Sequence, residues 1–268
     1  MRKLLALTAA VAVGAAIVGS ALADHSWNNY HWERSANPVE LPTGDNVDSS
    51  WDAYLVGAIG DWNLSSVVQL NKVAGGTSSK NCRATAGRIE ACNASYGNTG
   101  WLGIAQIWVS GSHITQAITK VNDTYFDTTT YDTPAWRALV MCQEIAHDFG
   151  LGHQDETFDN ANLGSCMDYT NDPDGGAGGA SSNDPSNEHP NTDDFNHLDD
   201  IYAHLDGGGG GGGGGVPGCP GPAPKCQNGA GNPPPFSQAD RANGSVYLDA
   251  LPGGAKRITH VFWTPFGE

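Results

Sequence analysis

The feature that most restricts the fold is an uninterrupted run of nine glycines at residues 207–215. Glycine is the most flexible residue in an unfolded chain, so such a run holds neither a helix nor a strand and behaves as a tether. It separates residues 24–206, a length that can bury a sizeable core, from a tail at 216–268. The tail is rich in proline and glycine up to residue 235 and has strand-like stretches at 245–248 and 257–263. A small Cys-stapled binding module and a partly disordered appendage both fit this tail.

Residues 1–23 have the pattern of an export signal. Arg2 and Lys3 precede an apolar run over residues 4–18, and Ala21 and Ala23 form a small-residue cleavage site. No later segment reaches the length that a membrane-spanning helix needs. The sequence therefore predicts a secreted, extracellular protein that begins near residue 24 and has no membrane contact after cleavage.

The charge balance argues against polyanionic partners. Acidic residues number 29 and basic residues 13, which gives a formal charge of −16, or −18 once Arg2 and Lys3 are removed. Nucleic acids and anionic lipids bind cationic surfaces that displace their counterions. We therefore expect neither as a partner.

Six cysteines in an exported chain predict disulfide bonds. Six cysteines allow 15 pairings, so proximity in sequence gives a preference and not a deduction. No neighbouring couple has the C-x-x-C spacing of a zinc or redox site, which favours structural bridges. The preferred couples are Cys82 with Cys92, Cys142 with Cys166, and Cys219 with Cys226.

The periodicity of residues 24–206 predicts one domain of mixed α and β structure. A helix is expected to begin at Asp48 or Ser49, because apolar residues then recur at helical spacing. Thr133 followed by Pro134 predicts an N-cap and a proline in the first turn of a second helix, which runs towards Gly150. Strands are expected at 30–32, 66–73, 87–94, 101–109 and 113–121, and a last helix at 193–205.

The stretch that carries chemistry is Gln-Glu-Ile-Ala-His-Asp-Phe-Gly-Leu-Gly-His at 143–153. Gln143 and His147 lie one helical turn apart, and Glu144 lies beside that face. Gly150 tolerates the left-handed conformation that ends a helix, so the chain can bring His153 back to the same point. Two imidazoles beside a carboxylate suit a catalytic metal, which needs an open position for water and a nearby base.

The pattern Glu-x-x-His-x-x-Gly-x-x-His, with Met167 in Ser-Cys-Met-Asp-Tyr at 165–169, resembles the metzincin clan of zinc endopeptidases. The clan's first histidine is Gln143 here, a replacement that also occurs in a gametolysin-like branch. The resemblance covers most of residues 30–206. It implies an α/β (α+β) fold with a twisted mixed sheet, an active-site helix, a Met-turn and a C-terminal helix.

For activity, the resemblance implies a metallo-endopeptidase that cleaves protein or peptide substrates. The chain is expected to be a monomer. Its substrate would lie extended along 101–109, taken as an edge strand. A bond between Cys142 and Cys166 would tie the active-site helix to the floor of the site. The implied roles are zinc binding by His147 and His153 with help from Gln143, general base catalysis by Glu144, the floor beneath the metal by Met167, and a hydrogen bond to the oxyanion from Tyr169.

Replacement of the clan's first histidine leaves three alternatives open. Gln143 binds zinc weakly through its carbonyl oxygen, or a nearby Tyr169, Asp155 or His189 completes the site. In the third alternative metal binding is lost, and the chain is a secreted binding or scaffolding module.

Metals other than zinc also remain open. Another divalent ion could occupy the histidine site. Calcium would find carboxylate and amide oxygens in the loop 170–191, but these lack a fixed ligand spacing, so a solvated loop is the preferred interpretation. His25, His31 and His113 are expected to be structural or surface groups.

Overall fold

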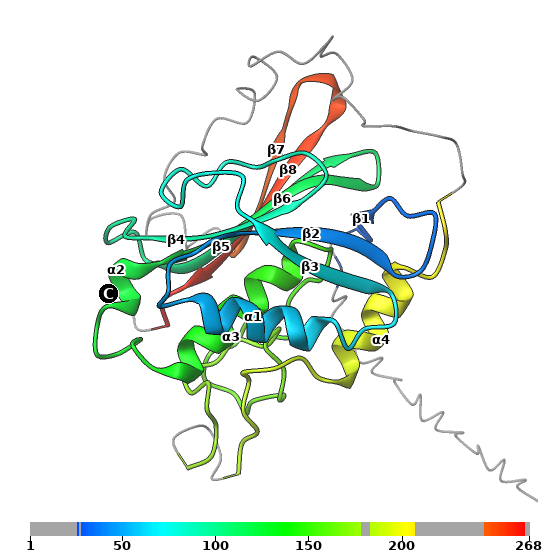
Figure 1. The fold of residues 1–268 in the computed structure, drawn as a ribbon. Coiled ribbons are helices and arrows are strands. Elements are labelled where there is room, and N and C mark those ends of the chain that lie inside the picture. Colours follow the sequence, from blue (N-terminus) through cyan, green and yellow to red (C-terminus); the bar gives the residue numbers. More distant parts are fainter. Residues whose placement is uncertain (1–25, 27, 178–182, 207–243, 266–268) are drawn as a thin grey trace, which may run out of the picture.

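The computed structural model describes residues 26, 28–177, 183–206 and 244–265. It has the expected mixture of α and β structure, built as one mixed eight-stranded sheet with few helices (Figure 1). Within these ranges no helix is both long and apolar enough to cross a membrane.

The sheet has the strand order β3-β2-β4-β6-β5-β8-β7, and β1 pairs with β6 outside this path. Its first half is parallel: β2 pairs with β3 and β4, and β4 pairs with β6. Its second half is antiparallel, through β6, β5, β8 and β7. The strands are β1 (His31–Trp32), β2 (Val39–Asn46), β3 (Val68–Ala74), β4 (Ile89–Ala94), β5 (Trp101–Ser110), β6 (His113–Asn122), β7 (Val246–Ala250) and β8 (Lys256–Trp263).

Helices α1 (Asp52–Trp62) and α3 (Pro134–His147) lie together on one face of the sheet (Figure 1). The start of α3 is as predicted, because the side chain of Thr133 accepts a hydrogen bond from the backbone N–H of Trp136 and proline occupies the first turn. The short helix α2 (Asp123–Phe126) directly follows β6.

The last helix of the 24–206 segment, α4 (Thr192–Ile201), is shorter than predicted and ends before residue 205. Asn191 caps it, with a reciprocal contact from Asp194 that forms a capping box. Strand β2 is not among the predicted strands, because Pro42 and Gly44 interrupt its apolar pattern. Pairing with β3 and β4 on both sides nevertheless holds β2 as a strand.

The tail beyond the glycine run contributes to the same sheet. Strands β7 and β8 form a hairpin around a short 3₁₀ turn (Pro252–Gly254), and β8 pairs along nearly the whole of β5. The expectation that 101–109 is an edge strand was therefore wrong: β5 lies between β6 and β8. The physical reason is that β8 of the tail pairs with the backbone N–H and C=O groups that β5 would otherwise expose.

Two of the expected disulfides are present. Cys142–Cys166 lies in the main core, and Cys82–Cys92 lies in a separate small cluster with Trp108 and Ile118. The expected bond between Cys219 and Cys226 lies outside the described residues, as do the expected export signal and the glycine run.

A buried lysine gives the stability of the fold a predictable pH dependence. Lys120 on β6 is only 8% exposed, and burial, aided by the charge of Arg257, lowers the pKa of its ammonium group from 10.5 to about 8. Below pH 8 both folded and unfolded chains carry this charge, so the folded state bears its full desolvation cost. Between pH 8 and 10.5 the folded chain loses the proton first, and stability rises with pH.

Lys120→Met should therefore stabilise the protein at pH 7. The pKa shift corresponds to about 3 kcal/mol, from which the lost contact with the Tyr96 ring subtracts about 1 kcal/mol. Urea unfolding at pH 7 and pH 10 should show an advantage that shrinks at the higher pH. Lys80→Met is the matched control, since Lys80 also contacts Tyr96 but is exposed. An advantage of equal size at both pH values would refute the desolvation argument.

Candidate metal centre

The C-terminal turn of α3 brings three polar side chains into the core. Gln143 and Glu144 are fully buried and His147 is almost so. The helix ends at once, because Gly150 adopts a positive φ of 111° and a side chain there would collide with the carbonyl oxygen of Tyr30. The chain then turns back and brings His153 beside His147, with ring centroids 4.6 Å apart.

Both histidines are oriented by a hydrogen bond at Nδ1. His147 Nδ1 lies 2.8 Å from the carbonyl oxygen of Leu151, and His153 Nδ1 lies 2.7 Å from a carboxylate oxygen of Glu156. Since these oxygens only accept, both Nδ1 atoms carry the proton, and both Nε2 atoms are left with a lone pair. Each Nε2 is buried and has no hydrogen-bond partner in the described part of the chain. This arrangement is typical of histidines that bind a metal.

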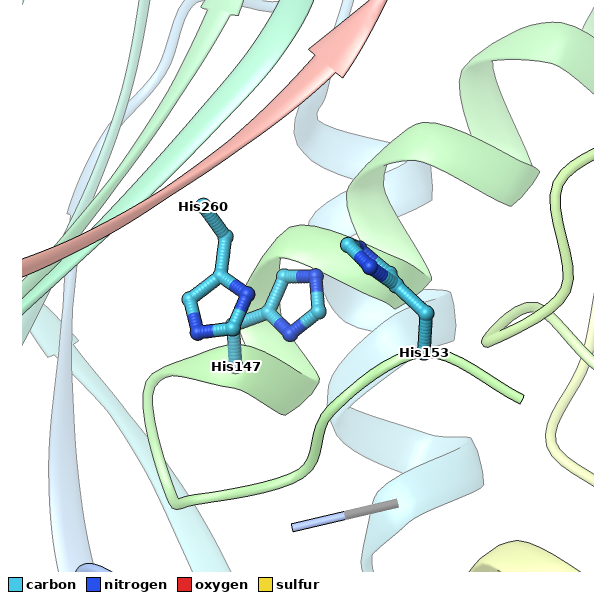
Figure 2. Close-up of side chains that lie close together, drawn as sticks. All are labelled: His147, His153 and His260. Atoms are coloured by element: carbon cyan, nitrogen blue, oxygen red, sulfur yellow. The ribbon is translucent and has the colours of Figure 1, made fainter. Parts of the chain in front are cut away.

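A third imidazole comes from the tail. His260 on β8 stacks on His147 with ring centroids 3.9 Å apart, and its centroid lies 5.6 Å from that of His153. One potential ligand atom from each of the three rings lies within 4.8 Å of the others. Figure 2 shows the rings converging from the end of α3, from the loop after it and from β8.

The electrostatics of the cluster favour the neutral form of His147 and His260, which is the form that binds a metal. Burial lowers the pKa of His147, and the neighbouring His260 and His153 lower it further. Burial likewise lowers the pKa of His260, to about 3. The hydrogen bond from His153 holds the pKa of Glu156 at about 2, so a carboxylate faces His153 at neutral pH.

Glu144 lies against β5, the strand along which the substrate is expected to lie. Gly103 on β5 makes room for it, because a Cβ atom at that position would lie 2.6 Å from the Glu144 carboxylate. Both carboxylate oxygens are buried, and neither has a hydrogen-bond partner within the described ranges. Burial raises the pKa of Glu144, and the charge of Asp148 adds to the effect. A buried carboxyl without a partner is costly unless water or a cation satisfies it.

The Gln143 amide is held on one side only. Its Nε2 donates to the carbonyl oxygen of Cys166 at 2.7 Å, while its Oε1 is buried and makes no hydrogen bond with the described residues. The orientation leaves Oε1 as an available acceptor. Met167, in the segment that Gln143 contacts, is fully buried in the main core.

Neither Asp155 nor His189 belongs to the cluster. A carboxylate oxygen of Asp155 accepts hydrogen bonds from the backbone of Thr157 and from Asn160. His189 is 68% exposed in its side chain and pairs with Asp61 at 2.7 Å. Among the described residues, the histidine that completes the group is therefore His260, not one of the residues named as alternatives.

Strand β8 closes the site. The side chain of His153 is 4% exposed, and His147 and His260 are 1% and 2% exposed. The Tyr169 hydroxyl donates to the backbone carbonyl oxygen of Val261, at 3.0 Å, and its ring packs 4.6 Å from that of His153. The Tyr169 hydroxyl thus donates to a backbone carbonyl of β8, whereas the resemblance implies that it donates to the substrate.

Comparison with known proteins adds no family assignment. No protein-family model matches the chain, and no curated protein matches its sequence.

The side chains that meet at the centre fit a divalent metal ion. Three imidazoles form a donor set that suits zinc and other transition metals, and two of them already have the carbonyl or carboxylate partner that orients a metal-binding ring. His260 is not among the expected metal ligands, because the sequence pattern separates the tail from the domain at 24–206. The strand-like pattern around His260 was visible, but no sequence signal gives the register of β8 on β5.

Proposed function

We propose that this chain is a secreted, zinc-dependent endopeptidase of the metzincin type, in a form closed by its own C-terminal strand. The observation that carries the proposal is the pairing of His147 and His153, each with an oriented and unpaired Nε2, beside the buried carboxylate of Glu144. The export signal expected at residues 1–23 and the two disulfides support an extracellular location.

In this proposal His147 and His153 would hold the zinc in every form of the protein. His260 would be a further ligand in the closed form, and Gln143 Oε1 would be the neutral oxygen ligand available in a form without β8 at the site. Bound zinc would polarise the scissile carbonyl and the attacking water. Met167 would form the buried floor of the site, as the clan resemblance implies.

The chain's own groups then supply acid–base chemistry and positioning. Glu144, whose pKa is raised by burial, takes a proton from the attacking water on a carboxylate oxygen and delivers it to the leaving amine nitrogen. Tyr169 donates a hydrogen bond from its hydroxyl to the substrate oxygen that gains charge. Substrate would pair with β5 in the position that β8 occupies in the closed form.

One observation favours a second function. The near-complete burial of the cluster would also suit a protein that keeps the fold as a binding or scaffolding module, with a metal that only stabilises it. The two functions differ in their need for Glu144. A peptidase needs its carboxylate for proton transfer, and a scaffold does not.

The test compares Glu144→Gln with its parent in two backgrounds, the wild type and His260→Ala. The assay uses zinc-loaded protein and a reduced, alkylated protein substrate. We expect Glu144→Gln to keep its zinc and to lose about 100-fold to 10,000-fold in cleavage rate wherever the parent is active. Glu33→Gln makes the same chemical change at an exposed position and should leave the rate unchanged. Parents that carry zinc but are as inert as Glu144→Gln in both backgrounds would reject the peptidase and leave the scaffold.

A further inference from the structure

A second cluster of side chains that could bind a metal ion lies outside the first one. His31 on β1, His113 at the start of β6 and Asp206 after α4 offer ligand atoms within 4.8 Å of one another. His204 lies at the more open side of this cluster, and its side chain is 57% exposed. The proposed peptidase mechanism uses none of these residues.

Three imidazoles converge on one carboxylate oxygen. The Nε2 atoms of His31 and His204 each lie 3.4 Å from Oδ1 of Asp206, and that of His113 lies 3.0 Å from it. The other oxygen of Asp206 accepts the backbone N–H of Arg34 at 2.7 Å, which fixes the carboxylate and leaves Oδ1 directed at the histidines.

If the His31 ring is neutral, hydrogen bonds alone do not account for its contact with Asp206. His31 Nδ1 lies 2.8 Å from the carbonyl oxygen of Asn29, which only accepts, so the proton of a neutral ring is on Nδ1. Its Nε2 then directs a lone pair at Oδ1 of Asp206. Two buried acceptors that face each other repel, unless His31 is protonated or a cation lies between them. The side chains of His31 and Asp206 are only 5% and 10% exposed, so water screens this contact poorly.

The distances match a tetrahedral zinc site. With zinc bonds of about 2.0 to 2.1 Å to nitrogen and oxygen, neighbouring ligand atoms of a tetrahedron lie about 3.3 Å apart. The Nε2 atoms of His31 and His113 lie 3.4 and 3.0 Å from Oδ1 of Asp206, and one potential ligand atom from each of these three residues lies within 4.8 Å of the others. We infer that His31, His113 and Asp206 form a second zinc site, with His204 at its open side.

The position of this site indicates a structural role. A zinc ion there would join β1, the start of β6 and the segment that follows α4, and this segment leads directly into the glycine run at 207–215. It would fix the two ends of the 24–206 segment to the sheet.

The test is the zinc content of the full chain, measured by mass spectrometry after equilibration at a buffered nanomolar free zinc concentration. We expect two zinc ions per chain in the wild type and one in Asp206→Asn, which keeps the shape of the side chain. His147→Ala should also bind one, held at the second site, and the double variant none. Asp200→Asn, the same change at an exposed position of α4, should keep two.

A count of two in Asp206→Asn would overturn the second site, and so would a count of one in the wild type that falls to zero in His147→Ala. The latter result would show that the second cluster binds no zinc, and it would leave the peptidase proposal intact. If the wild type binds one zinc and His147→Ala still binds one, the second site stands and the peptidase proposal fails. Should Asp206→Asn fail to fold, His113→Gln replaces it: its zinc affinity at the second site should fall at least tenfold, and an unchanged affinity would count against the site.

Discussion

His260→Ala is expected to bind zinc at least tenfold more weakly than the wild type and yet to cleave protein faster once it is saturated with zinc. The first effect follows because the closed form loses one of three imidazoles that converge within 4.8 Å. The second follows because His260 lies on the strand that fills the expected substrate position along β5. Without the proposed bond between His260 and the metal, β8 would be held less strongly at the site.

The size of the gain follows from the equilibrium between closed and open forms. Each 1.4 kcal/mol removed from the closed form raises the open fraction about tenfold while that fraction is small. Backbone pairing with β5 still holds β8, so we expect a gain of about tenfold and not full opening. The rate should be measured at several zinc concentrations, because the variant should be slower than the wild type at limiting zinc and faster at saturation.

His189→Ala is the matched control, since it removes an imidazole that is exposed and outside the cluster. Neither its zinc affinity nor its cleavage rate should change. If His260→Ala is slower than the wild type even at saturating zinc, His260 is a permanent ligand, and the view of β8 as a strand that closes the site is wrong.

The part of the site that local sequence determines could be predicted. Thr133 and Pro134 fix the start of α3, and Gly150 fixes its end, so the positions of Gln143, Glu144 and His147 follow from helical spacing alone. The apolar patterns of β5 and β6 are also local, and both strands lie where they were expected.

The third histidine could not be predicted, because its position depends on pairing between distant segments. His260 lies opposite Ala105 of β5, more than 150 residues earlier in the chain, and the glycine run between them carries no register information. The same limit applies to His31 and His113, which meet only because β1 pairs in parallel with β6. Contacts of this kind depend on sheet topology, which the pattern of a single strand does not determine.

Removal of the Cys142–Cys166 disulfide should destabilise both the fold and the metal centre. The bond closes a loop with a sequence separation of 24, for which chain entropy gives about 3 kcal/mol of stability. It also links α3 to the segment whose carbonyl, at Cys166, accepts the hydrogen bond of Gln143. Tyr169, which packs on His153, lies three residues further on. We therefore expect the double alanine variant to lose about 3 kcal/mol in urea unfolding and about tenfold or more in zinc affinity.

The Cys82–Cys92 disulfide provides the comparison that separates these two effects. It closes a loop with a sequence separation of 10, so its removal should cost only slightly less stability, also about 3 kcal/mol. It lies in the small cluster with Trp108 and Ile118, apart from the core that contains α3. Its double alanine variant should therefore keep the zinc affinity of the wild type. Equal losses of zinc affinity in the two variants would mean that the metal centre responds to global stability alone, and that the bond at Cys142 has no specific positioning role.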